Sequence, residues 1–155
     1  MTTKIIGTGS YLPEYVVTND DLAKLVDTSD EWIASRTGIR NRRIATNESG
    51  ADMAAAAAEE ALKDAGMDGS EIDLILVATC SSDFQFPSTA CLVQKAIHAT
   101  NAAAFDLSAA CSGFLFALHT AHAYIRAGIY KNILLVGVEV LSKLIDWNDR
   151  STCVL

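Results

Sequence analysis

The sequence lacks any long run of apolar residues, although half of its 155 residues are hydrophobic. A membrane-spanning helix needs about 18 to 20 consecutive apolar residues, and charged residues interrupt every apolar stretch here sooner. The first ten residues, MTTKIIGTGS, also lack the apolar core of a secretory signal peptide. We therefore expect one packed domain in a soluble, cytoplasmic protein with no membrane partner.

Cysteine is sparse and its spacing is irregular. The chain has four cysteines, Cys80, Cys91, Cys111 and Cys153, with no C-x-x-C pair and no cluster of histidines beside any of them. Structural zinc sites are built from such pairs and clusters, so we expect no bound metal. The cysteines are expected to be reduced thiols, and without further context each is read as a small buried apolar residue.

Positive charge is scarce: 12 lysines and arginines stand against 19 aspartates and glutamates, a formal net charge of −7. Such a surface repels polyanions, so we expect no nucleic-acid partner. Four of the basic residues are nevertheless concentrated in one short segment, namely Arg36, Arg40, Arg42 and Arg43. They form either ordinary surface salt bridges or a site for a ligand that bears phosphate.

The chain alternates apolar, branched segments with helical patterns. We expect strands over residues 4–8, 72–78, 103–107 and 133–138. We expect helices capped by Thr18 and Ser29, a helix over residues 51–65, one that opens at Pro87, and one over residues 112–127. Glycines Gly38, Gly66 and Gly128 suit the helix ends. Because parallel neighbours need crossover connections, this alternation predicts an α/β fold with a mainly parallel sheet.

The helix expected over residues 112–127 is unusual because it is apolar on all sides. It begins with the run Phe114, Leu115, Phe116, Ala117 and Leu118. A helix of this kind is buried between two layers, and the four strands expected here hardly suffice for two full sheets. We therefore expect that another part of the protein covers this helix.

Cys111 lies in the segment FDLSAACSGF, between an expected strand and this apolar helix. The small residues around it allow a tight turn and a close approach of substrate. The free N–H groups and the dipole of a helix N-terminus favour the thiolate, which could attack an acyl group while the same N–H groups receive the oxyanion. The alternative is a packed junction that happens to contain a cysteine, and the context favours a nucleophile.

The chain offers no evident base for Cys111. The backbone of His119 lies about 12 Å along the same helix at the α-helical rise, too far for a hydrogen-bonded pair, and His122 is farther still. His98 ends a preceding helix and cannot be placed from sequence. For all three histidines a solvated or structural role is the better interpretation.

Several motifs resemble, in order and spacing, the first half of the β-ketoacyl-acyl-carrier-protein synthase III family. They are KIIGTGSYLP, TSDEWI with RTGIR, FPS, AFDLSAACSGF, LLVGVEVLS and DRST. The resemblance implies a thiolase fold, a five-layer αβαβα sandwich of two similar halves, of which residues 1–155 would form the N-terminal half that carries the nucleophilic cysteine. The family's catalytic His and Asn, and a glycine of the oxyanion hole, belong to the second half, so we expect the isolated chain to be inactive.

The resemblance also implies a reaction. Cys111 would take an acyl group from acyl-CoA, malonyl-acyl-carrier protein would decarboxylate, and its carbanion would attack the acyl-cysteine to give a β-ketoacyl product. Coenzyme A would enter as the thioester substrate, with no other cofactor. The partners implied are acyl-CoA, malonyl-acyl-carrier protein, the second half of the enzyme and a second copy in a homodimer.

The family's coenzyme A residues carry over onto Trp32, Arg36 and Arg150, and more weakly onto Thr28. Trp32 and Arg36 stand at i and i+4 and would project from one helix face, although Trp32 could equally anchor a small core. Phe86 resembles the residue that reaches across the dimer to line the partner's acyl pocket. Its alternative is a hydrophobic contact before the helix that follows.

Two other interpretations stay open. One is a non-catalytic half that binds a ligand or partner without turnover. The other is a related condensing enzyme, such as a polyketide-initiating synthase or a hydroxymethylglutaryl-CoA synthase, which would share the fold and the cysteine.

Overall fold

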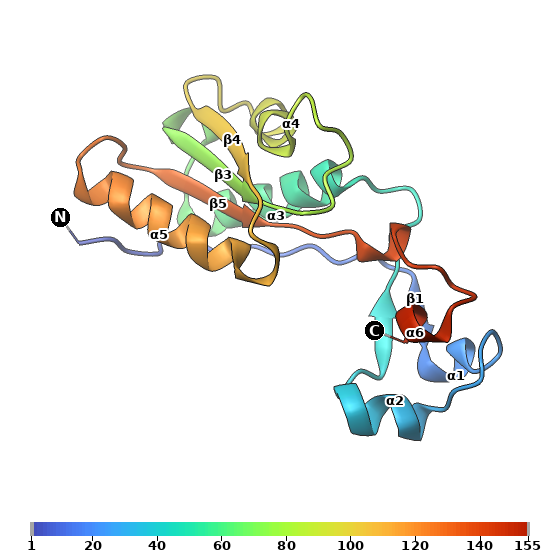
Figure 1. Ribbon diagram of the computed structural model, residues 1–155. Helices are drawn as coiled ribbons and strands as arrows, with labels where there is room; N and C mark the ends of the chain where they lie inside the picture. The colour runs from blue at the N-terminus through green and yellow to red at the C-terminus, as the bar shows by residue number, and fades with distance from the viewer. Residues whose placement is uncertain (1, 155) are drawn as a thin grey trace. The chain divides into compact units, whose positions relative to one another are not determined.

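Three parallel strands form the main sheet of the computed structural model, which describes residues 2–154 (Figure 1). They are β3 (Leu74–Ala78), β4 (Ala103–Leu107) and β5 (Ile133–Gly137), in the order β4-β3-β5. Leu74 of the central strand lies opposite Ala103 on one side and Ile133 on the other. The expected parallel sheet is thereby confirmed.

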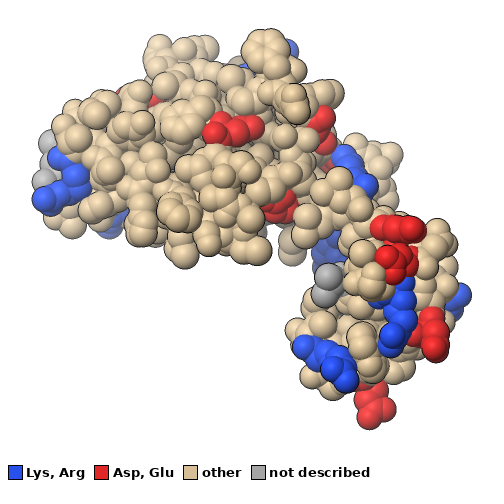
Figure 2. Space-filling model, viewed as in Figure 1, with Lys and Arg blue, Asp and Glu red and all other residues tan. Residues whose placement is uncertain are grey.

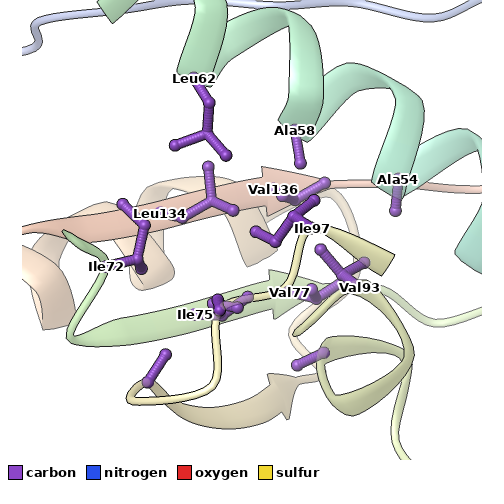
Figure 3. Close-up of a cluster of buried hydrophobic side chains, with 13 residues drawn as sticks. Ala54, Ala58, Leu62, Ile72, Ile75, Val77, Val93, Ile97, Leu134 and Val136 are labelled. Atoms are coloured by element: carbon purple, nitrogen blue, oxygen red, sulfur yellow. The ribbon is translucent and has the colours of Figure 1, made fainter. Parts of the chain in front are cut away.

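Helices cover both faces of this sheet. The helices α3 (Gly50–Ala65) and α4 (Thr89–Ala96) pack on one face, and α5 (Gly113–Arg126) packs on the other. Ile75 and Val77 of β3 point toward α3 and α4, where they join Ala58 and Val93 in the core of Figure 3. The alternate residues of β3 point toward α5. Burial on both faces explains why this strand is apolar at every position.

Local signals set the helix ends, and Thr18, Ser29 and Gly66 lie where the sequence predicts them. Ser49 caps α3 and exchanges hydrogen bonds with Asp52, and Gly66 ends the helix with a left-handed φ of 64°. Thr18 and Ser29 likewise cap the two N-terminal helices, α1 (Asn19–Leu22) and α2 (Asp30–Thr37). Capping satisfies N–H groups that have no partner in the first turn.

The chain divides into two units, a feature that the sequence patterns did not indicate. The larger unit contains residues 2–11 and 49–139, with the sheet and its helices. The smaller unit contains residues 12–48 and 140–154, with α1, α2, α6 (Arg150–Cys153) and the antiparallel pair β1 (Val16–Thr18) and β2 (Asn41–Arg43). Its core is formed by Leu22, Ile33, Cys153 and Val154. Short 3-10 turns, η1 (Gly69–Glu71), η2 (Ala110–Ser112) and η3 (Leu141–Lys143), complete the elements.

The strand expected over residues 4–8 is wrong for this structure, which has neither helix nor strand there. The backbone N–H groups of Thr8 and Ser10 donate to side-chain carboxylates of α3, with 2.9 Å between Thr8 N and Asp64 Oδ2. Gly9 permits this close contact, because a Cβ there would stand 2.2 Å from the carbonyl oxygen of Ala57. The segment therefore bonds to helix side chains instead of a neighbouring strand.

One further expectation needs correction. Pro87 does not open α4, because the helix begins at Thr89 and Ser88 is its cap.

The helix α5 has one covered side and one uncovered side, which agrees with the expectation that another part of the protein covers it. It is buried through Ala117 and Ala121, whereas Phe114, Leu115 and Phe116 are about half exposed. Within residues 2–154 a single sheet packs on α5, so only that side is covered.

Candidate active site

Cys111 lies at the carboxyl edge of the parallel sheet, where ligand sites of open α/β sheets are found. It belongs to the turn η2, between the end of β4 and the start of α5, and the residue is exposed. The preceding residue, Ala110, has a left-handed φ of 46°. This conformation costs a non-glycine residue roughly 1–2 kcal/mol. Gly113 lets the helix start close to β3, since a Cβ there would be 3.3 Å from that of Ala78.

A second cysteine braces this turn. The backbone N–H of Ala110 donates to Sγ of Cys80 at 3.2 Å, and the Ser108 hydroxyl lies 3.4 Å from the same sulfur. The N–H of Cys80 donates to Oε1 of Glu139 at 2.8 Å, and the Ser81 hydroxyl donates to the other carboxylate oxygen. Sequence reasoning missed Cys80 and Glu139. Their signal was position, because Cys80 follows the carboxyl end of β3, the strand beside β4, and Glu139 follows the carboxyl end of β5, the strand on the other side of β3.

No histidine is brought to Cys111 among the hydrogen bonds of the described residues. His98 follows α4 and precedes β4, which places it at the amino edge of the sheet, opposite Cys111. His119 lies along α5 and is exposed. The ring of His122 has its own contact, 2.7 Å from Nδ1 to the hydroxyl oxygen of Thr3. The expectation that this chain supplies no base is thus consistent with the positions of all three histidines.

The turn has the features of a nucleophile site. An exposed thiol precedes a 14-residue helix, and the backbone N–H groups at the start of that helix can stabilise a thiolate or a developing oxyanion. The described residues contain no group of three or more His, Cys, Asp or Glu arranged to hold a metal ion. The chemistry that this turn can perform is attack of the thiol on an acyl carbon.

The smaller unit gathers a second candidate site around Trp32. The guanidinium carbon of Arg36 lies 5.3 Å from the indole ring centroid, and that of Arg150 lies 4.5 Å from it. Trp32 and Arg36 share α2, as the i, i+4 spacing indicates, whereas α6 brings Arg150 to the same ring. An aromatic plane flanked by two guanidinium groups can bind a flat, anionic ligand.

The other arginines of the basic segment have different partners. Arg40 forms a 3.1 Å ion pair with Asp30 on the surface, as the salt-bridge interpretation expects. Arg42 donates to Oδ1 of Asn19 at 2.7 Å and to the carbonyl oxygen of Val154 at 2.6 Å. Burial lowers its pKa. The guanidinium of Arg43 donates to backbone carbonyl oxygens. Arg40, Arg42 and Arg43 therefore have structural partners, and Arg36 is the arginine of this segment that lies against an aromatic ring.

The roles predicted for Thr28 at the coenzyme A site and for Phe86 at the acyl pocket stay predictions. The hydroxyl of Thr28 is buried and has no hydrogen-bond partner within residues 2–154. Phe86 is 91% exposed in the segment before α4, so it forms no part of the core of this chain. The described residues contain no helix long and apolar enough to cross a membrane.

The comparisons with known proteins agree with this geometry. Residues 105–155 match the family model for 3-oxoacyl-acyl-carrier-protein synthase III. The β-ketoacyl-acyl-carrier-protein synthase III of Clostridium acetobutylicum is 60% identical over 99% of this chain and 47% of its own length. The crystal structure of the Aquifex aeolicus synthase III superposes with a TM-score of 0.97 at 57% identity, over 99% of this chain and 50% of that one. A priming β-ketosynthase of the R1128 polyketide pathway gives a TM-score of 0.95 at 40% identity, over 98% and 46%.

These matches, the parallel sheet and the cysteine turn define the class: the chain has the thiolase-like fold of condensing enzymes. More closely, nearly the whole chain is similar to part of the β-ketoacyl-acyl-carrier-protein synthase III proteins. The chain spans about half the length of the curated relatives it matches.

Proposed function

We propose that this chain supplies the nucleophile and the coenzyme A site of a condensing enzyme that initiates fatty acid synthesis. The observation that carries the proposal is the exposed Cys111 in a strained turn before α5. The family match over residues 105–155 includes this turn, and the relatives named above are synthases of this type.

In the first half-reaction the Cys111 thiolate attacks the carbonyl carbon of an acyl-CoA. A new S–C bond forms, the thioester bond to coenzyme A breaks, and the coenzyme A thiolate leaves and takes up a proton. The N–H groups at the start of α5 would stabilise the oxyanion of the tetrahedral intermediate. Their position is consistent with this role, because Cys111 is the middle residue of η2 and Ser112, the last residue of that turn, directly precedes α5.

In the second half-reaction malonyl-acyl-carrier protein loses CO2, and the resulting carbanion attacks the acyl-cysteine. A C–C bond forms, the S–C bond to Cys111 breaks, and β-ketoacyl-acyl-carrier protein leaves while the thiolate is restored. Among residues 2–154, no histidine contacts Cys111 by hydrogen bond. The groups that assist decarboxylation would therefore come from the second half that the family resemblance implies.

Coenzyme A would bind at Trp32, Arg36 and Arg150. The indole ring offers a face for the adenine, and the two guanidinium groups within 5.3 Å of its centroid offer charge for the phosphates. Thr28 is the weaker member of this proposed site and is included because of the family resemblance. Phe86, exposed before α4, would reach the acyl pocket of a second copy. The half-exposed apolar residues of α5 would be covered by the second half. Figure 2 shows few charged side chains over the exposed side of α5.

The experiment is acylation of the polypeptide that carries residues 1–155 together with the second half. After incubation with acetyl-CoA, peptide mass spectrometry should place the acyl group on Cys111. The variant Cys111→Ala should take up none, and the matched control Cys91→Ala should be acylated normally because Cys91 is not near the turn. Label on Cys80, Cys91 or Cys153 with Cys111 unmodified would contradict the proposal.

The ligand site is tested by titration with coenzyme A. Trp32→Ala and Arg36→Ala should each weaken binding by roughly three- to tenfold, the effect of one cation–π or phosphate contact, and Arg36→Ala should reduce the salt dependence. Lys24→Ala is a suitable control, since this exposed lysine pairs with Asp21 instead. Unchanged affinity in both variants, with normal circular dichroism, would remove the site from the proposal.

A further inference from the structure

Cys80 is a second thiol at the turn, and the proposed chemistry does not use it. Its sulfur contacts the turn at two points, the N–H of Ala110 at 3.2 Å and the hydroxyl of Ser108 at 3.4 Å. Ala110 directly precedes Cys111 in the chain. The side chain of one cysteine therefore holds the backbone that carries the other.

The residue that Cys80 holds is the strained one. The φ of Ala110 is 46°, a conformation that residues with a Cβ adopt rarely because the Cβ approaches a backbone oxygen. Such a residue keeps this conformation only where surrounding contacts stabilise it. The hydrogen bond from its N–H to Cys80 holds this residue from one side, and its carbonyl oxygen accepts the N–H of Gly113.

Cys80 is itself held in place. Its N–H donates to Glu139 at 2.8 Å, and the same carboxylate accepts the hydroxyl of Ser81. Glu139 follows β5, Cys80 follows β3 and Ser108 follows β4. The carboxyl ends of all three parallel strands are thus joined through Cys80 to the turn that presents Cys111.

We propose that Cys80 is a positioning residue for Cys111: its sulfur accepts the Ala110 N–H and so keeps the Cys111 thiol at the N-terminal end of α5. The inference rests on the proposed role of Cys111 as the nucleophile and adds the residue that sets its reactivity. When the acceptor is removed, the turn relaxes from its left-handed conformation. Cys111 then moves away from the groups that favour its thiolate form.

The test compares Cys80→Ala, which removes the acceptor, with Cys80→Ser, which keeps one in the hydroxyl oxygen. Cys91→Ala is the matched control, because Cys91 belongs to the same unit and its sulfur lies 4.0 Å from the carbonyl oxygen of Ala104, away from the turn. The measurement is the rate of Cys111 alkylation by iodoacetamide from about pH 6 to pH 9, followed by peptide mass spectrometry in the polypeptide that also carries the second half.

We expect Cys80→Ala to slow alkylation of Cys111 by roughly three- to tenfold at every pH measured, the effect of one hydrogen bond. Cys80→Ser should stay within about twofold of the parent, and Cys91→Ala should not differ from it. Coenzyme A affinity should be unchanged in all three, since Trp32 belongs to the other unit.

An unchanged rate in Cys80→Ala would overturn the proposal, and so would equal slowing in Cys80→Ser, because the size of the side chain would then matter and not its acceptor. If Cys80→Ala folds poorly, the test is hydrogen exchange of the Ala110 N–H in the parent protein. Exchange as fast as in an unstructured peptide would overturn the proposal, and protection of about tenfold or more would support it. Alkylation needs no acyl substrate, so a protein that fails to condense substrate would refute the proposed function and leave this inference standing.

Discussion

Replacing Arg42 by alanine should destabilise the smaller unit, whereas replacing Arg36 should not. The Arg42 guanidinium donates to Asn19 at 2.7 Å and to the carbonyl oxygen of Val154 at 2.6 Å. Asn19 is 1% exposed and Val154 is 5% exposed, so water would not easily take the place of the lost donor. Arg42 also joins β2 to the segment after α6, which makes it a link between distant parts of this unit.

The magnitude follows from these two bonds. A hydrogen bond from a charged group contributes about 1.5–3 kcal/mol, and two bonds from one side chain are not additive. We therefore expect a loss of about 3 kcal/mol in the free energy of unfolding. For a chain of this length, such a loss lowers Tm by about 6–12 °C.

Tryptophan fluorescence is the suitable assay. The chain has two tryptophans, Trp32 and Trp147, and both belong to the smaller unit, so the thermal transition of their emission reports on that unit. Arg36→Ala removes the same charge and should leave Tm within about 2 °C, as surface substitutions do, while it weakens coenzyme A binding. If Arg42→Ala melted like the parent chain, or if Arg36→Ala were the variant that lost stability, the assignment of these two arginines would be refuted.

Four other outcomes are expected. Gly9→Ala should cost about 1–3 kcal/mol in calorimetric unfolding, because its Cβ would overlap a carbonyl oxygen of α3; an unchanged Tm would show that the N-terminal segment does not pack there. Burial raises the pKa of the Cys153 thiol, so iodoacetamide at pH 8 should label Cys111 well before Cys153, and equal rates by mass spectrometry would contradict the packing. Hydrogen bonds from Ser151 lower the pKa of Asp149, the cap of α6. The stabilisation that the Asp149 carboxylate gives should be present above about pH 4, its pKa in the unfolded chain, and should be lost as the pH falls through its lower pKa in the folded chain. Tryptophan emission should follow this loss, and Asp149→Asn should weaken the pH dependence. The isolated chain should form no β-ketoacyl product and should associate on size-exclusion chromatography through the exposed side of α5; a monomer with normal turnover would require one of the three histidines to be reconsidered as the base.

The sequence by itself determined the features that depend on neighbours in the chain. The caps Thr18 and Ser29 and the end residue Gly66 lie where the helices begin and end, because capping bonds span only a few residues. The apolar run of β3 indicated a strand covered on both faces. The place of Cys111 between a strand and a helix was also readable, since small residues and apolar periodicity mark both elements.

Only the tertiary structure decided which distant groups meet. The segment over residues 4–8 has the apolar pattern of a strand, yet the N–H groups of Thr8 and of Ser10 just after it bond to carboxylates of α3, which the local pattern does not reveal. Arg150 reaches Trp32 because α6 packs within the smaller unit. Cys80 braces the Cys111 turn because β3 is the central strand and its end adjoins that of β4. Strand order and helix packing set these contacts, and both depend on burial across the whole chain instead of on any one segment.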